Sequence, residues 1–148
     1  MTFSYTINGE EITLDSFEDI INLENYNDIT YLGCWYRQLT ALPALPESLI
    51  KLSCQRNKLT CLPILPKSLT FLDCSNNKLT CLHSLPKTLT ILSCSHNKLT
   101  SLPVLPETLT DLSCQNNKLT SLPVLPESLT YLCYHVNPIC NHIEIYFI

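Results

Sequence analysis

Cysteine is the residue type with the clearest chemical potential in this chain, which contains nine of them among 148 residues. Five recur at intervals of twenty residues: Cys34, Cys54, Cys74, Cys94 and Cys114. A cysteine at a fixed phase of a repeat can form a disulfide, bind a metal, act as a nucleophile or fill a small space in a core. The direction of its side chain decides among these roles, so the elements that carry it must be found first.

The cysteines belong to a repeat of twenty residues with a fixed hydrophobic pattern. With Leu69 as position 1, leucine also occupies positions 4, 11, 14 and 17, and position 9 is asparagine, as in Asn77. Positions 4 and 6 alternate with positions 3, 5 and 7, which is typical of a strand with one buried face. One such strand cannot bury its leucines alone, so the pattern predicts repeats that stack in register.

The cysteine at position 6 therefore points inward, between leucines. A small apolar filler is the favoured interpretation, because free cysteine is usually buried. Side chains that run parallel suit a disulfide poorly, and no histidine joins the column to complete a zinc site. A role in thiol or metal chemistry stays open for a second group: Cys61, Cys81, His83 and Cys133.

The pattern L-x-x-L-x-C-x-x-N-x-L, followed by "LPALP", "LPILP" or "LPVLP", resembles the leucine-rich repeat. The period of twenty is similar to the shortest class of that family, which occurs in bacterial effector proteins and has counterparts in giant viruses. The resemblance covers residues 29–139 and implies a right-handed parallel solenoid that binds proteins. The pattern is broken at Arg37, where asparagine is expected, and at His83, where the other complete repeats have proline.

We therefore expect a repeat solenoid, mainly β, shaped as a right-handed parallel horseshoe arc. Proline at positions 15 and 18 disfavours a helix and predicts an extended or polyproline-like convex side. The repeats are expected over residues 29–137, as six leucine-rich repeats with the last one truncated. Residues 1–28 are expected to form a small α+β cap, and residues 138–148 a short C-terminal cap.

The expected N-terminal cap begins with a hairpin at Asn8-Gly9 and continues with a short helix capped by Asp15, with Glu18 three residues later. Its seven acidic residues, with no lysine or arginine, are interpreted as a hydrated surface. The C-terminal segment is too short for a covering helix. Its apolar residues, which include Ile143 and Phe147, favour a homodimer formed through this end.

The concave side should carry the side chains of positions 3, 5, 7 and 8. Position 3 changes from repeat to repeat, and tyrosine, tryptophan and arginine are the residue types that anchor interfaces. Twelve residues are candidates for binding a partner: Tyr31, Trp35, Tyr36, Lys51, Arg56, Phe71, Asp73, Ile91, His96, Asp111, Tyr131 and His135.

A non-enzymatic protein–protein interaction scaffold is the function that these features favour, with an unidentified protein partner and a host protein among the candidates. One alternative is a structural protein whose repeats mediate homo-oligomerisation, and another is a thiol- or metal-binding protein. No cofactor motif is present. Cys133 and His135 share a strand face and could form a nucleophile pair, but the sequence offers only Asp111, one repeat away, as an orienting acid.

Charge and hydropathy restrict the setting. The formal net charge is −4, which disfavours nucleic acid. A basic column at position 10 lacks interleaved aromatic residues, and we expect it to be a solvated stripe that pairs with Glu47, Glu107 and Glu127. Its members are Lys58, Lys78, Lys98 and Lys118. No apolar stretch of about 18 residues predicts a membrane span, and the N-terminal residues do not resemble a secretory signal. We therefore expect a cytoplasmic protein, in a host cytoplasm or its own, with reduced thiols.

Overall fold

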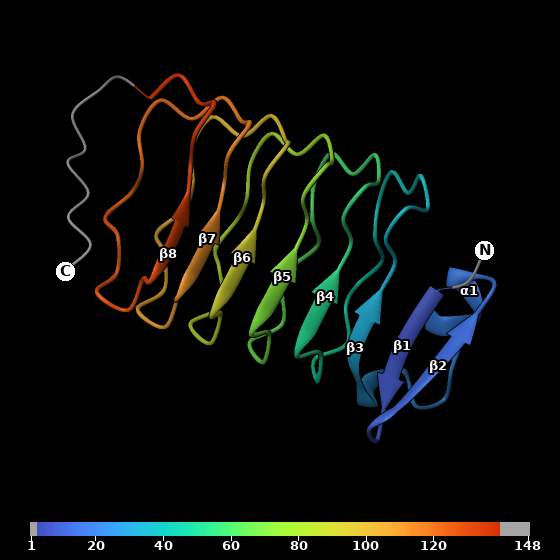
Figure 1. Cartoon of the computed structure of the whole chain (residues 1–148). Coiled ribbons are helices and arrows are strands. Elements are labelled where there is room, and N and C mark those ends of the chain that lie inside the picture. The colour runs from blue at the N-terminus through green and yellow to red at the C-terminus, as the bar shows by residue number, and fades with distance from the viewer. Residues whose placement is uncertain (1–2, 140–148) are drawn as a thin grey trace.

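The computed structural model describes residues 3–139, apart from the side chain of Phe17. Eight strands form one curved sheet in the order β2-β1-β3-β4-β5-β6-β7-β8 (Figure 1). The strands are β1 (Phe3–Ile7), β2 (Glu10–Leu14), β3 (Ile29–Gly33), β4 (Lys51–Ser53), β5 (Phe71–Asp73), β6 (Ile91–Ser93), β7 (Asp111–Ser113) and β8 (Tyr131–Cys133). A short helix α1 (Phe17–Ile21) and a 3-10 turn η1 (Tyr26–Asp28) lie between β2 and β3.

The repeat strands β3 to β8 are parallel and pair without any shift in register. Leu52 pairs with Leu72, and Leu72 pairs with Leu92. Each position of the repeat therefore stands beside its counterpart twenty residues away, and no helix interrupts the return segments between the described strands. This arrangement confirms the expected mainly-β horseshoe with an extended convex side (Figure 1).

The core is a stack of identical layers. In the central repeats the leucines at positions 1, 4 and 11 are buried, as Leu69, Leu72 and Leu79 illustrate, and so are the cysteines at position 6 from Cys34 to Cys114. A strand of three residues buries little by itself, so stability comes from the stacking of neighbouring layers. The prediction that position 6 points into the core is confirmed.

The asparagine at position 9 links each repeat to the one before it. Asn77 donates from Nδ2 to the carbonyls of Cys54 (3.0 Å) and Cys74 (3.0 Å), while its Oδ1 accepts from the backbone N–H of Leu59 (3.0 Å). The same bonds recur at Asn57, Asn97 and Asn117, which are all buried, and in large part at Asn137. A buried amide thus satisfies backbone groups of two consecutive repeats.

This backward reach explains why the first repeat tolerates Arg37 in place of asparagine. An asparagine there would bond to a preceding parallel repeat, but the neighbour of β3 on that side is the antiparallel strand β1. The backbone N–H of Arg37 instead donates to Oδ1 of Asn57, in the following repeat, at 2.9 Å.

The asparagine bonds form one ladder of side-chain hydrogen bonds along the array. A second ladder, made by serine and threonine hydroxyls, runs along the opposite end of the strands and was not predicted from the sequence. The hydroxyl of Ser68 donates to the carbonyls of Glu47 (2.7 Å) and Leu49 (2.8 Å) in the preceding repeat. Equivalent bonds are made by the residues at the same position of other repeats: Ser48, Thr88, Thr108 and Ser128. The turns between convex side and strand are therefore tied together by side chains as well.

The N-terminal hairpin extends the sheet. Asn8 and Gly9 form its turn with φ angles of 51° and 83°, as expected for Asn-Gly, and β1 pairs antiparallel with both β2 and β3. Helix α1 begins one residue later than expected, because the hydroxyl of Ser16, and not Asp15, caps it by accepting from the N–H of Glu18 at 3.1 Å. The boundaries at residues 28 and 137 stay predictions. The expected C-terminal cap lies outside the described residues from residue 140 onward.

The convex side differs in the repeat that contains His83 and Ser84. Equivalent positions carry Pro103 and Val104 in the next repeat. Proline fixes φ near the value that an extended return segment needs and so lowers the entropy of the unfolded chain. Histidine does not supply this restriction, and the N–H of His83 donates to no backbone carbonyl of the described residues.

Asn97→Ala should lower the free energy of unfolding by about 2–4 kcal/mol, because several buried backbone groups lose their partner together. Urea denaturation checks this value. Thr100→Ala, an exposed change three residues further along the same loop, is the matched control and should alter stability by less than about 0.5 kcal/mol. Equal effects of the two changes would contradict the role assigned to the ladder.

His83→Pro should raise the free energy of unfolding by about 0.4–1 kcal/mol, since the four other complete repeats accept proline at this position. Thermal and urea unfolding measure the change. A destabilised variant would mean that the backbone at His83 departs from the conformation of the other repeats.

Candidate interaction surface

The side chains at positions 3, 5, 7 and 8 form the sheet face away from the leucines, which we call the concave face. Its position-3 row joins neighbours in strict register, so that Lys51 stands between Tyr31 and Phe71, and Asp111 between Ile91 and Tyr131. None of the twelve side chains expected on this face is buried. The structure therefore leaves them accessible on one continuous surface, while their role in binding stays a prediction.

The first two repeats bring aromatic and arginine side chains together. The Arg56 guanidinium lies 5.0 Å from the centre of the Tyr36 ring, and its Nη1 donates to the Tyr36 hydroxyl at 2.8 Å. The Arg37 guanidinium lies 5.7 Å from the Trp35 ring and 5.3 Å from the Phe3 ring. The exposed fractions are 43% for Trp35 and 57% for Tyr36. Arg37 was not among the residues predicted for this site. The sequence did single it out, because it stands where the repeat pattern expects asparagine.

Tyr31 has a packing role in addition to its place in the row. Its hydroxyl and the Ser4 hydroxyl each lie 2.5 Å from the point where a Cβ on Gly33 would stand. Gly33 is buried, so the glycine makes room for the tyrosine beside the hairpin. Tyr31 is consequently a poorer anchor for a partner than the exposed Tyr131.

Position 8 displays its side chain from a left-handed backbone in every repeat. Tyr36, Arg56, His96 and Val136 have φ angles of 61°, 58°, 53° and 56°. Glycine would adopt this conformation without strain, but it would present nothing to a partner. His96, like Tyr36 and Arg56, contacts a side chain at position 8 of a neighbouring repeat: its Nε2 lies 3.5 Å from Nδ2 of Asn116.

The position-6 thiols from Cys34 to Cys114 are buried in the core, and we expect them to be unreactive. Burial raises the pKa of the Cys34 and Cys114 thiols to about 12, and it also raises those of Cys54, Cys74 and Cys94. Buried thiols of this kind stay protonated and unreactive. All eight cysteines between residues 3 and 139 are free thiols.

Within that same range, no group of three or more histidine, cysteine or acidic side chains is placed to hold a metal ion. Cys61 and Cys81 are exposed at the turn after the strands, whereas Cys133 is half-buried in β8. The helices of the described part are too short to cross a membrane.

Lysine side chains at position 10 do not pair as expected. No ion pair joins Lys58, Lys78, Lys98 or Lys118 to the glutamates of the neighbouring turns within residues 3–139; the Lys58 ammonium instead donates to Oε1 of Gln38 at 3.1 Å. Position 10 follows each strand, while Glu47, Glu107 and Glu127 precede the next one, so the two sets lie at opposite ends of the strands. The expected pairing was wrong for this reason.

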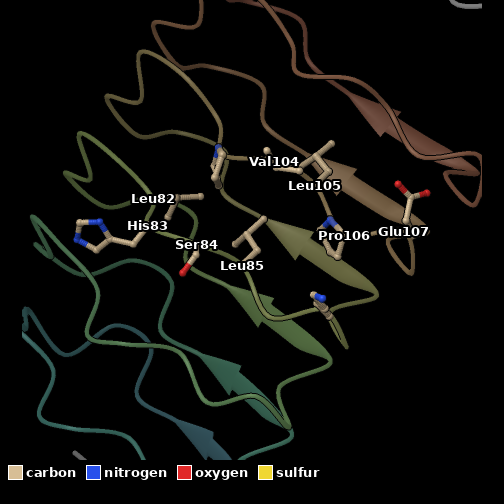
Figure 2. Close-up of a pocket in the computed structure, with 10 residues that line it drawn as sticks. Leu82, His83, Ser84, Leu85, Val104, Leu105, Pro106 and Glu107 are labelled. Carbon is tan, nitrogen blue, oxygen red and sulfur yellow. The ribbon is translucent and has the colours of Figure 1, made fainter.

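The convex side carries a hollow of about 850 Å³ between two successive return segments. Leu82 and Leu85 border it from one segment, and Val104 and Leu105 from the next (Figure 2). It lies where His83 replaces the proline of the other complete repeats and Ser84 replaces the apolar residue found at Ile64, Val104 and Val124. An exposed apolar row formed by Ile64, Val104 and Val124 continues on both sides.

The raised pKa values of the buried thiols predict a loss of stability in alkali. Above about pH 8.5 the thiols of the unfolded chain ionise while those of the folded chain stay protonated, so the free energy of unfolding falls by up to about 1.4 kcal/mol per pH unit for each buried thiol. Urea unfolding between pH 7 and pH 10 should show this slope. Cys74→Val should make the slope shallower, whereas Cys61→Val, at an exposed site, should leave it unchanged.

Comparisons with known proteins agree with this architecture. The family model described as Leucine Rich Repeat matches residues 68–87. A search of the curated proteins finds no match. Among solved structures, the chain is similar to a Shigella effector LRR domain, with 36% identity and a TM-score of 0.76 over 81% of this chain and 56% of that one.

Two structures of YopM are also similar. The leucine-rich effector YopM from Yersinia pestis shares 40% identity and a TM-score of 0.68 over 69% of this chain, and YopM from Yersinia enterocolitica shares 36% identity and a TM-score of 0.53 over 68%. The present chain spans 56% of the Shigella domain and 30% of the Y. pestis protein. The twenty-residue period, the in-register parallel strands and these similarities show that the chain is a leucine-rich repeat protein of the short class found in bacterial effectors.

Proposed function

We propose that this protein is an interaction scaffold that binds a protein partner on its concave face. The observation that carries the proposal is which positions of the repeat change in residue type from one repeat to the next. Buried positions 1, 4 and 11 are leucine in nearly every repeat, whereas position 3 on the concave face holds tyrosine, lysine, phenylalanine, isoleucine and aspartate. Apart from Tyr31, which packs over Gly33, the position-3 side chains point away from the leucine core and are available for recognition.

The proposed interface has an anchor at its N-terminal end. Tyr36 and Arg56 are already held together by their stacking and hydrogen bond, so a partner that packs on them loses less side-chain entropy. Trp35 adds an exposed aromatic surface beside them. These three residue types supply the strongest contributions to many protein interfaces.

The rest of the proposed interface is a row of larger side chains above a floor of small ones. Phe71, Ile91 and Tyr131 stand at position 3, and Ser93 and Ser113 occupy position 5 in the same strands. Such a profile accepts protruding side chains of a partner between the rows. Both signs of charge are also present, as Lys51 and Asp111 show, so we expect electrostatic contacts to contribute to the selection of the partner.

The solved structures that resemble this chain are effectors of Shigella and Yersinia. On that basis we propose a host protein as the partner, and a host cytoplasm as the place of binding. Because the chain spans only part of those proteins, both statements concern this repeat array alone.

Simultaneous Trp35→Ala, Tyr36→Ala and Tyr131→Ala changes should abolish capture of the partner from a mammalian cell lysate, since the exposed anchors are removed while the core is untouched. Affinity purification with quantitative mass spectrometry measures capture. The matched control is Ile64→Ala, Val104→Ala and Val124→Ala, which removes three exposed apolar side chains from the convex side.

The control variant should retain the partners of the unchanged protein, and both variants should keep the thermal midpoint within a few degrees. Capture that survives the concave changes but is lost in the control would move the binding site to the convex hollow. Solution mass, measured for all three proteins, also tests the predicted homodimer, whose apolar residues 143–148 lie outside the part of the chain that the structure describes.

A further inference from the structure

Cys133 and His135 make a contact on the concave face that the interaction scaffold does not require. Sγ of Cys133 lies 3.2 Å from Nδ1 of His135, within hydrogen-bond distance of a thiol and an imidazole. The thiol is half-buried and the histidine exposed, at the end of β8. A thiol in contact with a titratable base is the arrangement that generates a nucleophilic thiolate.

The fold enforces this proximity. Cys133 occupies position 5 and His135 position 7, and side chains at these two positions project on the same side of the strand. The repeat of β5 shows the same relation independently, because the Ser75 hydroxyl and backbone N–H both donate to Oδ1 of Asp73. The equivalent pair one repeat before Cys133 is Ser113 and Gln115, so the last described repeat differs by having a thiol and an imidazole.

The other cysteines lack this arrangement. The position-6 thiols are buried, and the alkaline pKa of Cys114 follows from that burial. Cys61 and Cys81 are exposed, but neither sulfur forms a hydrogen bond with a base among residues 3–139, which makes both of them internal references. On β7, Ser113 pairs in register with Cys133 and Asp111 with Tyr131, and the buried thiol of Cys114 lies close enough to Cys133 to interact with it electrostatically.

We propose that Cys133 is a reactive thiol, activated by His135, that takes small anionic disulfides of the glutathione type. The Cys133 proton passes to Nδ1 of His135, and the resulting thiolate attacks one sulfur of the disulfide. A new S–S bond forms to Cys133 as the original S–S bond breaks, and the departing thiolate takes up the proton from the imidazolium. No additional oxidant is needed, because the disulfide itself is reduced. The imidazolium also favours an anionic reagent near the sulfur.

The test treats the reduced full-length protein with oxidised glutathione and maps the modified cysteines by mass spectrometry over time. At pH 7 we expect Cys133 to react at least about threefold faster than Cys61 or Cys81, because the imidazole in contact with its sulfur accepts the thiol proton as the sulfur attacks. Alkylation should also favour the anion iodoacetate over neutral iodoacetamide more strongly at Cys133 than at Cys61.

His135→Gln is the discriminating variant, because glutamine already occupies this position at Gln55 and Gln115 and is therefore compatible with the fold. It should reduce the rate at Cys133 to that of Cys61 and remove the preference for iodoacetate. His96→Gln, which changes a histidine without a thiol neighbour, should leave both unchanged. The proposal is overturned if Cys133 reacts no faster than Cys61, or if His135→Gln leaves its rate and its preference for iodoacetate intact. Neither result depends on whether the concave face binds a protein.

Discussion

The hydrogen bonds of the asparagine at position 9 are the constraint on which the rest of this structure depends. The repeat strands β4 to β8 are only three residues long, so sheet pairing alone fixes little of the chain. The amide of Asn97 adds four backbone contacts across two repeats, with distances of 2.9 to 3.2 Å. These bonds require consecutive repeats to stand in exact phase, which in turn aligns the leucine layers and the rows of the concave face. The cysteine that precedes each asparagine is part of the same constraint, because its carbonyl accepts from the amide of the next repeat.

Much of this architecture was predictable because the twenty-residue period determines the pairing of neighbouring strands: each residue pairs with the one twenty positions away. A residue such as Leu72 has one counterpart in each neighbouring repeat, so identifying the strand phase assigns the core, the inward cysteines and the exposed rows together. Signals confined to a few neighbouring residues, such as those for the start of helix α1, determined the structure less closely. Asp15 and Ser16 are both good N-cap residues, and only the path of the chain decides that the Ser16 hydroxyl reaches the N–H of Glu18.

The contacts that escaped prediction are those set by side-chain rotamers. The hydroxyl ladder through Ser68 and Thr88 depends on which of several carbonyls a short side chain faces. The stacking of Arg56 on Tyr36, and the way Tyr31 lies over Gly33, depend on long side chains that cross between strands. Periodicity places such residues on a face, but it does not state which neighbour they touch. This is why the candidate surface could be predicted as a set of residues and not as a set of contacts.

The direction of the asparagine bonds has a consequence for how the protein is made. Every such amide reaches back to the preceding repeat, so the N–H of Leu59 receives its partner from Asn77, and the carbonyl of Cys54, already bonded to Asn57, receives its second donor from Asn77. During translation a repeat therefore remains incomplete until about twenty more residues have emerged, which takes about one to four seconds at ordinary rates of synthesis. The hydrogen bonds of the array are therefore completed in chain order, starting from the N-terminal hairpin. Each newly synthesised repeat supplies the asparagine that stabilises the repeat before it.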